Sequence, residues 1–322
     1  MNKSTIKPLN PFWVIVGKEI SSTVRSWKFL IMLALVLLTC IGSLYAALDD
    51  FSSAIKGGRA DDDFFFLKLF SHSDGTLPSY IIFISFLGPL LGISMGFDAI
   101  NSEQHRGTLS RVLAQPIYRD YILNAKFTAS LILLSSLFVA LSFLVLGFGL
   151  IFIGIPPTAD EFMRIILLSV VTIVYVAFWL NLSILFSVKF RQTATSALAG
   201  ISVWLFFTIF YGMIVNLIAK AVAPVRFFSE TQVINFQRFI QNLMRFNPGQ
   251  LFNDATTTLL MPSVRSLGPL STEQTIGAIP SPLPLGQSLM LVWPQVTALI
   301  GGTLLFFAIA YTMFMRREIR SR

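Results

Sequence analysis

The sequence predicts an all-α integral membrane protein with six transmembrane helices, and three observations predict it. Of its 322 residues, 54% are hydrophobic and only 12% are charged, whereas a soluble globular domain has about 25% charged residues. Six stretches are long enough to cross a bilayer and contain no Asp, Glu, Lys or Arg. Basic residues gather on one side of these stretches. The chain is therefore expected to form a single transmembrane domain over residues 1–322.

The six predicted spans follow from the length of helix, about 20 apolar residues, that a bilayer requires. They cover residues 29–48, 79–97, 127–153, 165–188, 193–219 and 289–315. A charge at the middle of the bilayer costs about 2.5 to 3.5 kcal/mol, so only charge-free runs are stable there. A secretory signal peptide is the alternative for the first run, but its leader of 28 residues is long and no small-x-small site follows it.

The distribution of Lys and Arg predicts the orientation. With a cytoplasmic N-terminus, the inner segments hold fifteen of the 24 basic residues but only five of the 16 acidic ones. Basic residues near the ends of spans stay on the cytoplasmic side. We therefore expect a multi-pass protein of the cell membrane, surrounded by membrane lipid, with both termini cytoplasmic.

Several kinds of chemistry are absent from the sequence. The single cysteine, Cys40, lies in the first span, so no internal disulfide and no thiol cluster for zinc can form. Basic residues are scattered rather than arranged as a stripe with aromatics, which argues against nucleic-acid binding. The two histidines, His72 and His105, fall on opposite sides of the membrane, so a membrane enzyme is disfavoured. No cofactor is expected in this chain.

A nucleotide-hydrolysing site of the Walker type is also missing. Such a loop requires G-x-x-x-x-G-K-[ST], because glycine amides and a lysine hold the phosphates. The only Gly-Lys pair, Gly17-Lys18, is followed by Glu19 and has Phe12 where the first glycine belongs. No span carries an ionisable residue of the kind that couples transport to ions. Any ATP hydrolysis must therefore come from a partner.

The segments at the two faces of the membrane carry further patterns. Residues 11–28 have apolar positions at helical spacing and a tryptophan near each end, which predicts an amphipathic helix on the inner surface. Residues 48–78 are acidic and read as a solvated outer loop. In the second span, Gly88, Gly92 and Gly96 recur every four residues, which predicts close packing of this helix face against another helix.

The inner segment between spans two and three, residues 98–126, is the most informative stretch. A polar start that includes Glu103 extends the second span out of the membrane. Gly107 then breaks the helix, Thr108 can cap a new one, and Pro116 ends it. The short helix between the breakers presents three apolar side chains, which are Leu109, Val112 and Leu113.

This short helix is a suitable docking element for another protein. An apolar helix face can seat in a hydrophobic groove, while Arg106, Arg111 and Arg119 supply charged contacts around it. The alternative is an ordinary inner loop whose arginines only enforce topology. The residues alone leave both interpretations open.

The string GFDAINSEQHRGTLSRVLAQPIYRDYILNAKF resembles the segment after the second span in permeases of the ABC-two exporter class. In that class an acidic residue, a Gly-Thr-Leu, a proline, a basic residue and a lysine recur in this order. In this sequence they are Glu103, Gly107, Thr108, Leu109, Pro116, Arg119 and Lys126. The chain is similar to membrane subunits of bacterial multi-component exporters, such as that of nitrous-oxide reductase maturation. One departure is Asn124-Ala125, where a glycine before the lysine is common.

The resemblance implies that residues 108–115 form a coupling helix received by a separate cytoplasmic ABC ATPase, which would hold ATP and magnesium. It also implies that two permease copies, in a homodimer, assemble with two ATPases. On this interpretation, the chain is expected to be the permease of an exporter. A non-conducting subunit that transmits the motion of the ATPase to an extracytoplasmic accessory protein is the alternative.

The outer segment, residues 220–288, is longer than a simple loop. Ser229-Glu230-Thr231-Gln232 matches a capping box, and apolar residues follow at helical spacing up to Asn247-Pro248-Gly249. A second short helix over residues 250–261 is expected to return. The pair is predicted either to pack on the span ends or to form an outer lid.

Overall fold

The computed structural model describes residues 10–56, 64–71, 78–107, 118–154, 156–223, 229–263, 267 and 282–316. Within these ranges the chain is built from helices and contains no β-strand. Six helical stretches are long and apolar enough to cross a membrane, which confirms the predicted fold class and number of spans. They are Trp27–Leu48, Tyr80–His105, Arg119–Phe152, Ala159–Lys189, Thr193–Val222 and Leu285–Arg316.

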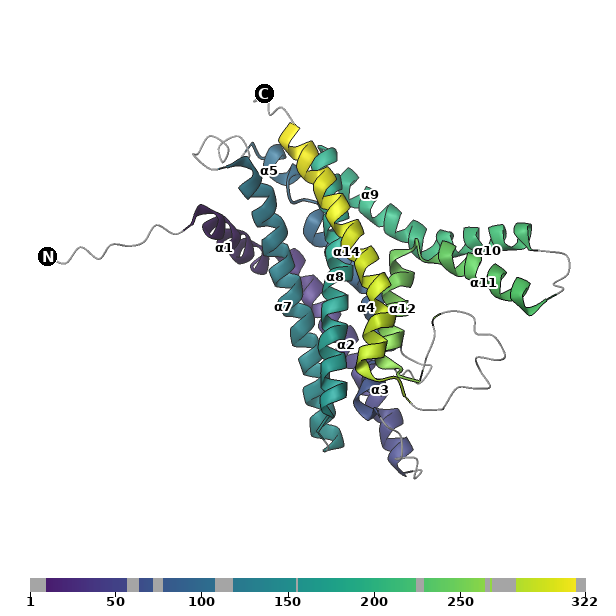
Figure 1. Cartoon of the computed structure of the whole chain (residues 1–322). Helices are drawn as coiled ribbons and strands as arrows, with labels where there is room; N and C mark the ends of the chain where they lie inside the picture. Colours follow the sequence, from purple (N-terminus) through teal and green to yellow (C-terminus); the bar gives the residue numbers. More distant parts are fainter. Residues whose placement is uncertain are drawn as a thin grey trace.

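Helix α8 (Ala159–Lys189) is the centre of the bundle and its most buried span. It packs against α4 (Tyr80–Gly96), α14 (Leu285–Arg316) and α7 (Arg119–Ile153), as Figure 1 shows. Its N-terminus carries a reciprocal capping box between Thr158 and Glu161. α8 also contacts α9 (Thr193–Leu205), so it touches four of the other spans.

The glycines of α4 lie against α8. A Cβ added at Gly92 would sit 2.7 Å from the Val176 carbonyl oxygen, and one at Gly96 would sit 2.8 Å from the Leu180 carbonyl oxygen. At Gly88 the nearest atom, 3.1 Å away, belongs to the Val176 side chain rather than to backbone. Absence of side chains at Gly92 and Gly96 therefore sets how closely the two helices approach.

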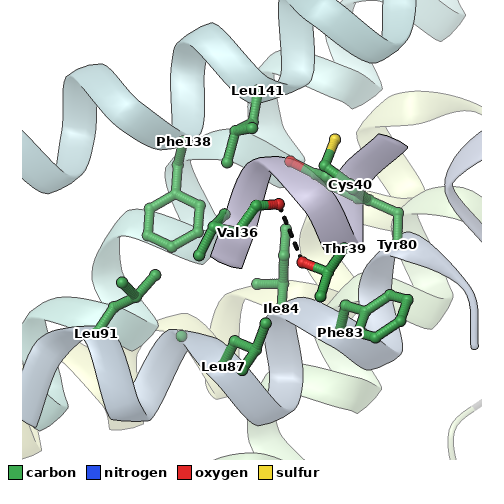
Figure 2. Close-up of a pocket in the computed structure, with 11 residues that line it drawn as sticks. Val36, Thr39, Cys40, Tyr80, Phe83, Ile84, Leu87, Leu91, Phe138 and Leu141 are labelled. Atoms are coloured by element: carbon green, nitrogen blue, oxygen red, sulfur yellow. Dashed lines mark hydrogen bonds between the residues drawn. The ribbon is translucent and has the colours of Figure 1, made fainter. Parts of the chain in front are cut away.

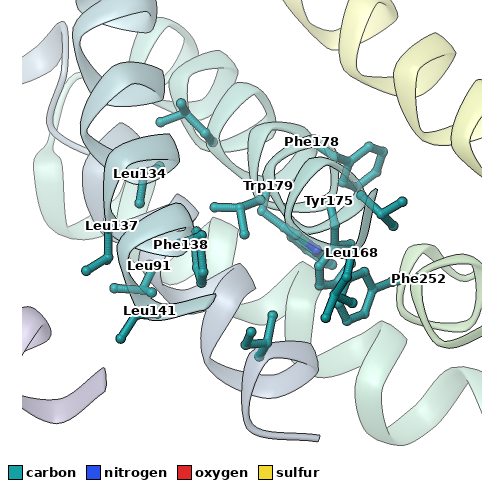
Figure 3. Close-up of a cluster of buried hydrophobic side chains, with 14 of the residues drawn as sticks. Leu91, Leu134, Leu137, Phe138, Leu141, Leu168, Tyr175, Phe178, Trp179 and Phe252 are labelled. Atoms are coloured by element: carbon teal, nitrogen blue, oxygen red, sulfur yellow. The ribbon is translucent and has the colours of Figure 1, made fainter. Parts of the chain in front are cut away.

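Leucine and aromatic side chains fill the interior around α8 (Figure 3). The Tyr175 ring stacks on Phe252, with centroids 4.4 Å apart and planes inclined by 13°. Trp179 is fully buried one turn further along. Phe252 belongs to α12 (Pro248–Leu260), so this stack fastens the outer segment to the central helix.

A small apolar cavity lies between α2 (Trp27–Lys56), α4 and α7 (Figure 2). Its volume of about 10 Å³ matches roughly one water molecule. Cys40 and Tyr80 are among its lining residues, with aliphatic side chains and Phe138 around them. This cavity is too small to hold a transported substrate.

The fifth span is one helical stretch, as the sequence predicts, but a π-helical turn interrupts its α-helical geometry. It consists of α9 (Thr193–Leu205), a π-helical turn η1 (Phe206–Phe210) and α10 (Tyr211–Val222). At the π turn the chain bends away from the bundle, and α10 projects from it together with α11 (Glu230–Met244) (Figure 1). No residue of α11 is buried.

The Asn247 side chain joins the π turn to the outer segment. Asn247 Nδ2 donates to the Phe207 carbonyl oxygen at 3.0 Å, and Asn247 Oδ1 accepts from Gly249 N at 2.9 Å, which caps α12. The Tyr211 hydroxyl also donates to the Leu243 carbonyl at 2.6 Å. The expected pair of outer helices is present, and Ser229 accepts from Gln232 N at the start of α11. α12 packs on the spans, while α11 contacts α10.

The outer loop predicted over residues 48–78 contains helix that the sequence did not suggest. α2 continues to Lys56, and α3 (Phe65–Ser71) follows. The acidic residues around this stretch obscure its apolar run, in which Phe66, Leu67 and Phe70 are fully buried. Packing against the outer ends of the spans therefore overrides the polar appearance of the segment.

Arg164 organises the outer ends of three elements and is fully buried. Its guanidinium donates to Asp160 at 2.7 Å and to the Leu283 carbonyl at 2.7 Å, and also to the Leu259 carbonyl and the Ser288 hydroxyl, both at 3.1 Å. Because several acceptors surround this buried charge, its burial is compensated. Arg164 thus holds α8, α12 and α14 together.

Candidate coupling site at the inner ends of the helices

The candidate site begins where α4 leaves the bundle and turns into α5 (Asn101–His105). The Ser187 hydroxyl on α8 accepts hydrogen bonds from Ile100 N at 2.9 Å and Asn101 N at 3.2 Å. These donors are the free amides at the start of the short helix. The central helix therefore fixes the position of α5 directly.

Lys126 on α7 bridges two other elements. Its Nζ lies 2.9 Å from Glu103 Oε1 on α5 and 3.1 Å from Glu19 Oε2 on α1 (Pro11–Val24). The Lys126 side chain is only 8% exposed, and the two carboxylates are 15–16% exposed. Ion pairs that are shielded from water in this way are stronger than surface pairs. We call Glu19, Glu103 and Lys126 the inner charge triad.

A second ion pair lies beside the triad. Lys28 at the start of α2 contacts both carboxylate oxygens of Asp98, at 2.9 and 3.0 Å. Its ammonium also lies 5.0 Å from the Phe97 ring centroid. The triad and the Lys28–Asp98 pair together connect α1, α2, α5 and α7 with the inner end of the second span.

Arg119 connects the start of α7 to the end of α14. Its Nη2 donates to the Phe314 carbonyl oxygen at 2.8 Å, and the guanidinium lies 5.1 Å from the Phe314 ring centroid. A cation near the C-terminus of a helix is stabilised by the free carbonyls there. Arg119 is thus a structural contact between the third and sixth spans.

The structure places four of the predicted coupling residues. Glu103 belongs to the triad, Arg106 is exposed, Arg119 contacts α14, and Gly107 adopts a positive φ of 67°. That backbone conformation favours glycine and ends the polar helix. The remaining predicted residues lie outside the described part of the chain. They are Thr108, Leu109, Arg111, Val112, Leu113 and Pro116.

The sequence-based reasoning did not identify Glu19, Lys28 and Asp98 as members of the site. Each is a charge beside the inner end of a predicted span, and that position is the only signal they give in the sequence. Which carboxylate meets which lysine depends on the packing of helices that are far apart in the chain. The packing glycines Gly88 and Gly92 lie deeper in the bundle, against α8, and outside this site.

Among the described residues, no three His, Cys, Asp or Glu side chains come together in a group that could hold a metal ion. The charges at the inner ends are instead paired with one another. These ion pairs join α1, α2, α5 and α7 at one end of the bundle.

A bundle of six candidate spans with paired charges at one end defines a multi-span membrane protein. The chain belongs to the family described as ABC-2 family transporter protein, which matches residues 13–319. It is therefore a permease subunit of an ABC transporter. It is 24% identical over 314 residues to the probable ABC transporter permease protein NosY of Pseudomonas aeruginosa, covering 95% of this chain and 98% of that protein. The NosY protein of Stutzerimonas stutzeri is 25% identical over 319 residues, covering 96% and 99% of the two chains.

Proposed function

We propose that this permease couples ATP hydrolysis in a separate cytoplasmic ABC ATPase subunit, which binds ATP and magnesium, to export of a substrate. The observation that carries the proposal is the inner charge triad, in which Lys126 joins α5 to α1 and α7. The residues directly after α5 are those that resemble a coupling helix. A push on residues 108–115 would therefore reach three helices through one buried lysine.

Two routes lead from the coupling segment into the bundle. Through the triad, displacement of α5 pulls on α1 and α7. Through Ser187, it acts on α8, whose backbone is in close contact with Gly92 and Gly96 of α4. Because packed cores respond as rigid units rather than deforming gradually, a small shift at α5 changes the arrangement of whole spans.

The test of this proposal replaces the apolar face of the coupling helix. The triple variant Leu109→Asp, Val112→Asp and Leu113→Asp removes the surface that seats in the ATPase groove, so ATPase stimulation and transport should both be lost. A matched variant with Leu109→Met, Val112→Ile and Leu113→Met keeps an apolar face and should retain both. Co-purification with the ATPase is measured in parallel. Coupled activity that survives the three aspartates would contradict the proposal.

A homodimer is part of the same proposal. The α9–α10 stretch exposes large apolar side chains, including Leu198, Met213 and Leu217, which are 60–66% exposed, and α11 buries no residue. A second permease copy would cover part of this surface, and membrane lipid the rest. The test is a mass measurement of the purified chain in detergent in the presence of the ATPase. A monomeric permease under those conditions would contradict the homodimer.

A non-conducting subunit that transmits force is the second candidate. The outer helices α11 and α12 support it, since α12 is fastened to the central helix by the Tyr175–Phe252 stack and could relay motion to an extracytoplasmic accessory protein. Reconstitution of the permease and ATPase alone in vesicles distinguishes the two functions. Transport of a purified substrate under those conditions would rule out the second candidate.

A further inference from the structure

A half-open cavity of about 500 Å³ lies at the inner end of the bundle, between α1, α2, α4, α5 and α7. Its volume falls in the range of about 300–1,000 Å³ that is usual for small-molecule sites. Charged side chains and hydroxyl groups form much of its lining, together with Met95, Ala99 and Ala129. The cavity thus offers both polar contacts and an apolar wall.

The lining carries more positive than negative charge. Four cations face the cavity, which are Lys18, Lys28, Arg106 and Lys126, against three carboxylates. The excess is a single positive charge. An anion is therefore the favoured occupant.

Each carboxylate of the lining is in contact with a cation of the lining. Asp98 is bound by Lys28 at 2.9 Å, and Glu19 and Glu103 are bound by Lys126 at 3.1 and 2.9 Å. Because Lys126 faces two carboxylates, the triad keeps one net negative charge, and Lys18 lies 3.5 Å from its Glu19 carboxylate.

Lys18 and Arg106 carry two positive charges against the one net negative charge of the triad, so one positive charge remains for a ligand. Lys18 is 64% exposed and makes only a long contact of 3.5 Å with Glu19. Arg106 is exposed and makes no ion pair with any residue that the structure describes. Both side chains are long enough to turn toward a bound anion. The guanidinium is well suited to a phosphate, because it donates two parallel hydrogen bonds.

The position of the cavity identifies the source of the anion. Trp13 on α1 and Trp27 at the start of α2 are 56% and 79% exposed, and exposed tryptophans mark the headgroup layer of a membrane. An apolar stripe on α2 begins at Trp27, next to the cavity residue Lys28. It continues through Ile31 and Leu38, which are 63% and 73% exposed. Headgroup and acyl chain thus both have adjacent surfaces to occupy.

We propose that this cavity binds the headgroup of an anionic phospholipid of the inner leaflet. The headgroup phosphate lies between Lys18 and Arg106, and an acyl chain follows the exposed stripe of α2. The hydroxyls of Thr23 and Ser130 line the same cavity and supply further donors. A lipid in this place would contact α1 and α5 at once, so membrane composition would influence the junction that contains the triad.

The test measures lipid binding to the full-length chain without any ATPase, so its result is independent of the coupling proposal. The chain is purified in detergent and titrated with phosphatidylglycerol or phosphatidylcholine, and bound lipid is counted by native mass spectrometry. The double variant Lys18→Gln/Arg106→Gln should weaken phosphatidylglycerol binding on the order of tenfold, since basic side chains near a membrane surface each contribute to lipid attraction. Arg25→Gln, which removes a charge from the same side of the membrane but outside the cavity lining, should leave binding unchanged.

Three results would overturn the proposal. Unchanged phosphatidylglycerol binding in the double variant would show that the cavity is not the site. An equal loss in Arg25→Gln would show general surface attraction. Saturation by inorganic phosphate, with no preference for phosphatidylglycerol over phosphatidylcholine, would make free phosphate the occupant. Lys18 and Arg106 are both exposed, and circular dichroism of each single variant checks that loss of fold is not the cause.

Discussion

At the scale of single residues, Lys126 is the most consequential side chain of the inner site. It satisfies two carboxylates that belong to different helices, and it is itself almost fully buried. The presence of a lysine at this position could be read from the sequence. Its two partners could not, because Glu19 lies 107 positions away in the chain and reaches Lys126 only through helix packing.

Lys126→Met should destabilise the protein by about 3 kcal/mol, because two partly buried carboxylates would then face each other without a cation. Lys18→Met provides the matched control. Its ammonium is exposed, so its removal should change stability by less than about 0.5 kcal/mol. Unfolding of both variants by SDS in mixed micelles measures the difference. Equal stability of the two variants would show that the triad contributes nothing to the fold.

At the scale of helices, the contact between α4 and α8 illustrates what a sequence pattern can and cannot predict. The four-residue spacing of the glycines predicted a close helix contact. It did not indicate which helix would be the partner. That choice depends on the complementary surface of α8, where the backbone around Val176 and Leu180 is accessible to α4.

Gly92→Ala should cost about 1–3 kcal/mol, because the new Cβ would lie 2.7 Å from a backbone oxygen and the helices would have to separate. Gly147→Ala in α7 is the control, since no heavy atom lies within 4 Å of its added Cβ. That substitution should be neutral, or stabilising by up to about 1 kcal/mol through helix propensity. The same mixed-micelle unfolding reports both. A Gly92→Ala protein as stable as the control would mean that α4 and α8 can move apart without cost.

The π turn of the fifth span carries a contact that a hydropathy pattern does not contain. A run of apolar residues predicts a helix, but it gives no sign of a π turn within it. Within the turn, the Phe207 carbonyl accepts a hydrogen bond from the Asn247 side chain of the outer segment, which we expect to stabilise the turn.

Asn247→Asp keeps the oxygen that caps α12 but removes the donor to the Phe207 carbonyl. Amides of residues 206–211 should then exchange about fivefold faster, because a net hydrogen bond is worth about 1 kcal/mol. Asn253→Asp, an exposed position on the same helix, introduces the same charge and should leave exchange unchanged. Hydrogen exchange followed by mass spectrometry gives the comparison, and identical rates in both variants would refute the role of Asn247.

At the scale of the whole molecule, orientation in the membrane is a prediction from charge alone. Cysteine variants are made in a Cys40→Ala background. With Thr5→Cys or Ser321→Cys, a membrane-impermeant maleimide should label the protein only after the cells are opened. A cysteine at Ser263, in the outer segment, should react in intact cells. Labelling of either terminus in intact cells would reverse the topology, and with it the assignment of residues 98–126 to the cytoplasm.

The sequence by itself determined the fold class, the six spans and the helical character of the outer segment. The reason is physical: a lipid solvent excludes charges and requires about 20 apolar residues in each crossing. Glu103, Gly107 and Arg119 could also be singled out, because their order along the chain matches a family pattern.

Only the tertiary structure decided which helices touch and which charges pair. It made α8 the central helix, brought Glu19 to Lys126, placed helix α3 in the acidic outer loop and opened the inner cavity. Such contacts join residues far apart in the chain. They depend on the shapes of packed surfaces, which the local periodicity and charge of a sequence do not specify.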